Sequence, residues 1–141
     1  MKRWLIATLV LLLCVSLQPS LIAGTVEDAG KAWLDEHKDP AAVNVNGDWH
    51  SKEWGVFHLT QAEGAREVSG TAPRFELTGV VSGNSLFLLF SKGGGGVSFC
   101  ATLGSENNKT LAGTYSYRVT RWKFGHGLCQ EKGYTLHMTK Q

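Results

Sequence analysis

Apolar and polar residues alternate along most of the chain from Val45 to Lys140. Successive side chains of a β-strand point to opposite faces, so this alternation predicts strands with one buried and one exposed face. The alternating runs are separated by short turns rich in Gly, Asn and Ser, which are typical of hairpin connections. We predict eight strands, at residues 45–49, 57–60, 67–71, 75–81, 86–90, 97–103, 111–119 and 134–140.

The predicted strands follow one another without any connection long enough for a crossover. Regular short strands joined by hairpins favour an up-and-down meander over a Greek key. Closing such a meander removes its two edges, and eight strands leave an interior just wide enough for side chains or one small ligand. Similar fragments around Gly70, Gly79 and Gly113 supply the small residues that strongly coiled strands need. We therefore predict an all-β fold, a single eight-stranded antiparallel up-and-down β-barrel in residues 45–141.

The strand at residues 86–90 differs from the others because all five positions, Leu86 to Phe90, are apolar. Such a run is typical of a strand that is covered on both faces. The barrel interior supplies one cover, and either an N-terminal helix or a partner chain supplies the other. In residues 25–44, Val26, Ala29 and Trp33 recur at near-helical spacing ahead of Pro40, which predicts a short helix and an extended linker. A homo-oligomer formed through the Leu86–Phe90 strand is the competing prediction.

Residues 1–24 have the layout of a cleaved secretory signal peptide. Lys2 and Arg3 precede an apolar run that is shorter than the ~20 residues of a comfortable membrane span, and Ala23-Gly24 supplies small residues. We expect a secreted or periplasmic protein with no membrane attachment after cleavage. The chain has 14 Lys and Arg against 12 Asp and Glu, and loss of Lys2 and Arg3 makes these counts equal. A balanced charge does not favour nucleic acid as a partner.

Two cysteines follow the predicted signal peptide, Cys100 and Cys129. In an oxidising compartment an even pair of cysteines favours a disulfide, so we predict a Cys100–Cys129 bridge. A nucleophilic cysteine is the alternative, and it requires a partner base that the sequence does not indicate.

The first predicted strand contains Gly47-Asp48-Trp49, which resembles the G-x-W opening of the calycins, the group that includes lipocalins and avidins. Gly70-Thr71, Leu77-Thr78-Gly79 and the final Thr139-Lys140 are similar to features of the avidin branch. The resemblance implies the barrel architecture over about 95 residues. It also implies that Trp49 packs across one end of the barrel against a basic residue late in the chain, for which Arg118, Arg121 and Lys140 are the candidates; we favour Arg121.

The biotin contacts of avidins do not carry over to this sequence. Ser51 stands where the family has Asn, Ala72 stands where it has Tyr, and Phe90 lies near the position of a missing tryptophan. The resemblance therefore implies an architecture without biotin binding.

Candidate chemistry is sparse. The histidines do not follow a zinc-ligand spacing, the carboxylates do not form a recognisable catalytic pair, and Gly93 to Gly96 lacks the Lys and the helix of a phosphate loop. We predict no catalytic residue, metal site or cofactor. The remaining candidate is a ligand pocket lined by inward-facing residues: Phe57, Leu59, Phe75, Leu77, Leu88, Phe90, Phe99, Tyr115 and Tyr117.

Three functions are compatible with this pattern. The first is a non-enzymatic barrel that binds a small apolar or amphipathic molecule in its mouth. The second is a protein-interaction or inhibitor module that uses the outer face, on which Phe87 and Leu89 would form an apolar patch. The third, an enzyme, has no residue constellation to support it, because function must be argued from a site rather than from a fold.

Overall fold

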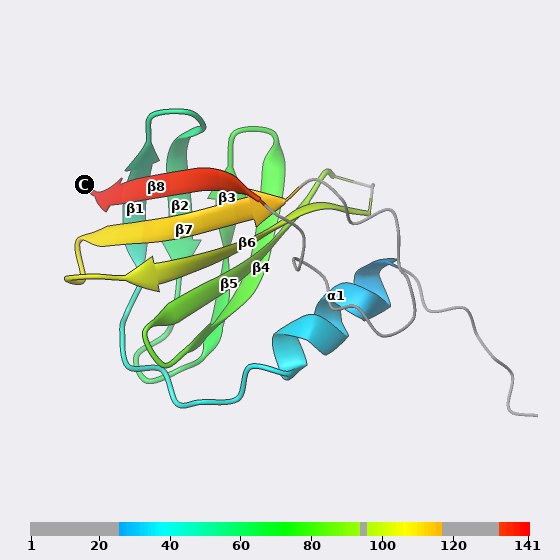
Figure 1. Cartoon of the computed structure of the whole chain (residues 1–141), viewed down its shortest axis with the longest axis horizontal. Helices are drawn as coiled ribbons and strands as arrows, with labels where there is room; N and C mark the ends of the chain where they lie inside the picture. The colour runs from blue at the N-terminus through cyan, green and yellow to red at the C-terminus, as the bar shows by residue number, and fades with distance from the viewer. Residues whose placement is uncertain (1–25, 94–95, 117–132) are drawn as a thin grey trace, which may run out of the picture.

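The computed structural model describes residues 26–93, 96–116 and 133–141, and it confirms a closed eight-stranded antiparallel barrel. One helix, α1 (Val26–Asp35), precedes the strands. The strands are β1 (Gly47–Ser51), β2 (Gly55–Thr60), β3 (Glu67–Ala72), β4 (Phe75–Ser82), β5 (Ser85–Ser91), β6 (Val97–Ser105), β7 (Thr110–Ser116) and β8 (Tyr134–Lys140). Each strand pairs with its neighbours in sequence, and β8 returns to pair with β1 (Figure 1).

The first strand begins later than the alternation predicts. Val45 is buried as expected, but its backbone N–H donates to the side-chain Oε1 of Gln61 at 2.7 Å instead of joining a ladder. The first β1–β2 pair is Gly47 with Leu59. The predicted end of the seventh strand, at residue 119, lies outside the described residues.

Glycines allow the strands to coil tightly, as the repeated fragments predict. A Cβ at Gly70 would meet the carbonyl oxygen of His58 on β2, and a Cβ at Gly113 would meet that of Thr102 on β6. Both positions lie on the inward face, where the curvature of a small barrel brings neighbouring backbones close together.

The barrel interior holds one apolar core built from the inward positions of the strands. Its largest fully buried side chains include Trp49, Phe57, Phe90, Leu86 and Met138. Inward residues from all eight strands meet in this core.

A second, smaller apolar cluster explains why β5 is apolar on both faces. On the outer face, Leu89 and Cys100 are buried against Trp33 and Leu34 of α1, with Phe87 packed beside them. The sequence left two candidates to cover the outer face of β5, an N-terminal helix and a partner chain. The structure shows that α1 covers it (Figure 1). A homo-oligomer through this strand stays a prediction. Cys129 lies outside the described residues, so the bridge to Cys100 also stays a prediction.

The N-terminal linker crosses one end of the barrel. Ala42 N donates to Gly83 O at 2.9 Å, and Gly83 N donates to Pro40 O at 3.0 Å. Residues 39–46 thus form a segment fixed to the β4–β5 turn, which we call the closing segment. Among the described residues, no helix is long and apolar enough to cross a membrane.

Candidate functional site

The two ends of the barrel are built differently. The closing segment and Trp49 lie at the closed end. The opposite end carries the β1–β2 turn and the β3–β4 turn, and we call it the mouth.

An aromatic cluster lies at the mouth, with Trp54 at its centre. The Trp54 ring lies 5.1 to 6.2 Å, centroid to centroid, from five other rings. These rings belong to Phe57, Phe75, Phe90, Phe99 and Tyr115. Most of the pairs are tilted or edge-to-face, the arrangements that aromatic quadrupoles favour, and each pair contributes about 0.5–1.5 kcal/mol beyond its burial.

The β1–β2 turn directs Trp54 into the barrel. The Ser51 hydroxyl is fully buried; it accepts from Trp54 N at 3.4 Å and donates to Glu53 Oε2 at 3.2 Å. Gly55 follows with a φ of 89°, a left-handed conformation that favours glycine. Ser51 therefore orders the turn that places Trp54 in the mouth.

The structure separates the predicted pocket residues into two groups. Five of them are fully buried in the interior core: Phe57, Leu59, Leu77, Leu88 and Phe90. Three are half-buried at the mouth and pack on that core: Phe75, Phe99 and Tyr115. Tyr117 lies outside the described residues. The three half-buried residues and Trp54 thus lie together at the mouth end of the core.

Trp54 is the site residue that sequence reasoning missed. It lies in a turn, where alternation carries no information about the direction of a side chain. The one available signal was a large apolar residue between polar Lys52-Glu53 and Gly55, since an indole in a short turn gains most by packing back onto the core.

Two further side chains border the aromatic cluster. Tyr134, at the start of β8, stacks on Tyr115 with ring centroids 5.6 Å apart and is 54% exposed. Lys92 Nζ lies 6.0 Å from the Phe75 ring centroid, within cation–π distance. The mouth therefore combines apolar rings with a phenol and a positive charge.

Trp49 is buried at the closed end, with a hydrogen bond and a nearby ammonium group. Its side chain is 1% exposed, its Nε1 donates to Val45 O at 2.8 Å, and Lys140 Nζ lies 5.6 Å from its ring. Lys140, one of the three candidates, is thus a basic partner of Trp49. Arg118 and Arg121 lie outside the described residues.

Most titratable side chains of the described ranges are exposed. No three His, Cys, Asp or Glu side chains there are grouped so as to hold a metal ion. His58 and Asp48 form an exposed pair on the outer face, with Nδ1 and Oδ1 2.7 Å apart. Burial lowers the pKa of His37, which stacks on Phe87 beneath the end of α1.

No family model, curated protein or solved structure gives a significant match to this chain. The likeness to calycins therefore rests on the barrel architecture itself, a closed antiparallel eight-stranded meander with a buried tryptophan near the start of its first strand.

Proposed function

We propose that the protein is a non-enzymatic binding barrel that takes a flat apolar or amphipathic molecule at its mouth. The aromatic cluster around Trp54 carries this proposal. Among the described residues, its half-buried rings combine apolar area with partial exposure, and small-molecule sites are lined mostly by apolar and aromatic side chains. The buried core residues below the cluster favour stacking at the mouth over deep insertion.

The proposal includes export of the protein. Residues 1–24 support a secreted or periplasmic location, and an oxidising compartment would also form the Cys100–Cys129 bridge. Cys100 is buried under α1, so the bridge would attach the chain around residue 129 to the outer face of β6.

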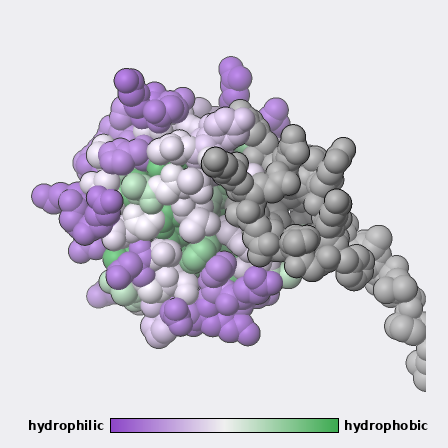
Figure 2. Space-filling model, in the orientation of Figure 1, coloured by the Kyte–Doolittle hydropathy of each residue, from purple (hydrophilic) through white to green (hydrophobic). Residues whose placement is uncertain are grey.

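The alternative function, a protein-interaction or inhibitor module, has less support from the structure than from the sequence. It depended on an uncovered patch of Phe87 and Leu89, and α1 packs over both. On the face shown in Figure 2, the apolar residues are separated by neutral and polar ones. In its described part, this face therefore does not show a continuous apolar patch of several hundred Å², the feature that marks many interfaces.

A fluorescence titration with the neutral aromatic probe N-phenyl-1-naphthylamine tests the proposal. We expect saturable enhancement, and Phe99→Leu should weaken binding about tenfold, because losing a stacked ring costs about 1.4 kcal/mol. Phe87→Leu is the matched control: it makes the same change at a half-buried ring beneath α1, and it should leave the affinity unchanged. Absence of saturable binding, or equal losses in the two variants, would refute the mouth site.

A further inference from the structure

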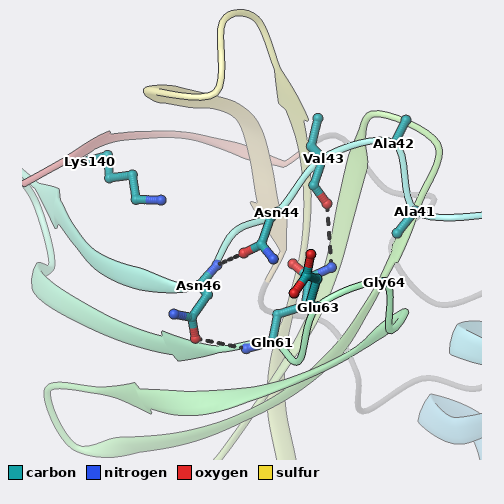
Figure 3. Close-up of a pocket in the computed structure, with 9 residues that line it drawn as sticks. All are labelled: Ala41, Ala42, Val43, Asn44, Asn46, Gln61, Glu63, Gly64 and Lys140. Carbon is teal, nitrogen blue, oxygen red and sulfur yellow. Dashed lines mark hydrogen bonds between the residues drawn. The ribbon is translucent and has the colours of Figure 1, made fainter.

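A hollow lies at the closed end, remote from the aromatic cluster. It has a volume of about 690 Å³ and lies between residues 41–46 of the closing segment, the turn from Gln61 to Gly64, and Lys140 at the end of β8 (Figure 3). This volume is within the range of small-molecule sites. Its lining is mostly polar, in contrast to the mouth.

Two asparagines present amide donors to this hollow. Asn44 Oδ1 accepts from Asn46 N at 2.8 Å, and Asn46 Oδ1 accepts from Gln61 N at 3.2 Å. A backbone N–H can only donate, so both amide oxygens are fixed and both Nδ2 groups must point elsewhere. In Figure 3 the Asn46 nitrogen points to the side where Lys140 lies, and the Asn44 nitrogen points to the side of Glu63.

The hollow carries one charge of each sign. Lys140 and Glu63 are its charged lining residues, and neither forms an ion pair with another residue of the described ranges. A simple anion would be repelled by Glu63, and a simple cation by Lys140. A molecule with both charges would satisfy both ends, since charge-assisted hydrogen bonds are the strong ones.

The wall behind the asparagines is held in place by a buried amide. Gln61 is 5% exposed; its Oε1 accepts from Val45 N at 2.7 Å, and its Nε2 donates to Ala65 O at 2.8 Å and Val43 O at 3.4 Å. These bonds join the closing segment to the β2–β3 turn. The donors are therefore positioned before a ligand arrives, which lowers the ordering cost of binding.

We propose that this hollow binds a small zwitterionic organic molecule, with its carboxylate on Lys140 and Asn46 and its ammonium group on Glu63. The site is independent of the mouth site. The barrel would then have two binding sites, an apolar aromatic one at the mouth and a polar, charged one at the closed end.

Three tripeptide probes test the charge requirement. In NMR titrations of the purified protein, triglycine should shift the amide signals of residues 41–46 and 61–64. N-acetyl-triglycine lacks the ammonium group and triglycine amide lacks the carboxylate, so each should bind at least about tenfold more weakly. Equal binding of all three probes, or no shift at these residues with triglycine, would overturn the proposal.

A pair of matched variants tests the geometry. Asn46→Asp keeps the oxygen that accepts from Gln61 N and replaces the amide donor with a carboxylate oxygen, so triglycine should bind at least about tenfold more weakly. Asn44→Asp adds the same charge on the side of Glu63 and should not weaken binding. Equal losses in the two variants would exclude the assigned orientation. Asn46→Asp should leave the affinity for N-phenyl-1-naphthylamine unchanged, so the two sites can fail separately.

Discussion

The two ends of the barrel hold a tryptophan by different kinds of interaction. At the closed end, Trp49 is buried, donates a hydrogen bond to Val45 O and has the Lys140 ammonium over its ring. At the mouth, Trp54 is half-buried and is surrounded by five aromatic rings. Hydrogen bonds are directional, so they fix one geometry, whereas ring packing tolerates offsets and tilts.

This difference assigns different roles to the two ends. The closed end is fixed by backbone and amide hydrogen bonds that few rearrangements could replace. The mouth can exchange one ring contact for another at a small cost in free energy, so a flat ligand could enter its packing. Stability should therefore depend more on the closed end, and apolar binding on the mouth.

The largest expected effect comes from removing each tryptophan in turn. Trp49→Ala should lower the free energy of unfolding by about 4 kcal/mol, because it leaves a large cavity in the core. Trp54→Ala should cost about half as much, since its ring is only half-buried and neighbouring rings can close the space. Urea denaturation measures both values. Equal losses would contradict the contrast between the two ends.

The next effect isolates the buried amide of the closed end. Gln61→Met keeps the length of the side chain but leaves Val45 N and Ala65 O without their partner. We expect a loss of about 2–3 kcal/mol, the cost of buried backbone groups without hydrogen bonds. Hydrogen exchange at the Val45 amide should accelerate accordingly. Phe99→Leu at the mouth is the comparison variant, and it should cost less than about 1.5 kcal/mol.

Gln61 also marks a limit of the sequence interpretation. Alternation predicts the eight strands and the interior positions well, because burial of one face is a periodic property. It assigned residues 61–65 to a turn, and turn residues are usually exposed. Gln61 is buried because its amide forms hydrogen bonds with two backbone groups of a segment far away in sequence, Val45 N and Val43 O, and with Ala65 O of its own turn. That requirement arises only when the chain has folded.

Trp54 escaped prediction for a related reason. Its direction depends on the Ser51 and Gly55 geometry of the turn and on which strands face it across the barrel. By contrast, the cover of β5 by α1 was one of two alternatives indicated by sequence, since a fully apolar strand needs partners on both faces. The sequence thus predicted the burial of individual residues better than it predicted their contacts with one another.

A smaller effect should follow from removing the charge above Trp49. Lys140→Met keeps an aliphatic side chain over the ring and removes the ammonium group. We expect a loss of about 0.5–1 kcal/mol, the value of an exposed cation–π contact. The matched control is Lys109→Met in the β6–β7 turn, which should change the urea midpoint little. If Lys140→Met and Lys109→Met lower the urea midpoint equally, the contact between the Lys140 ammonium and the Trp49 ring does not contribute to stability.

The smallest effect concerns the attachment of α1, which leads into the closing segment. His37 stacks on Phe87 with ring centroids 3.5 Å apart, and the Arg66 guanidinium donates to its carbonyl oxygen. Its Nε2 is buried without a hydrogen-bond partner in the described structure, so a proton there would lack an acceptor. Burial lowers the pKa of His37, Arg66 also lowers it, and Glu36 acts in the opposite direction.

Because the pKa of His37 is lower in the folded state, the unfolded chain binds a proton first as pH falls. Stability from the docked, neutral ring is therefore complete above the ordinary histidine pKa of about 6.5 and declines as pH falls below it. Hydrogen exchange at pH 8 and pH 5 should show α1 losing protection at the lower pH, after correction for intrinsic rates. The first residues of β4, next to Phe75 at the mouth, should change less. His37→Gln should remove this difference. If α1 of the variant lost as much protection at pH 5 as the unchanged protein, the pH dependence would come from another group. His37 would then not contribute to the attachment of α1.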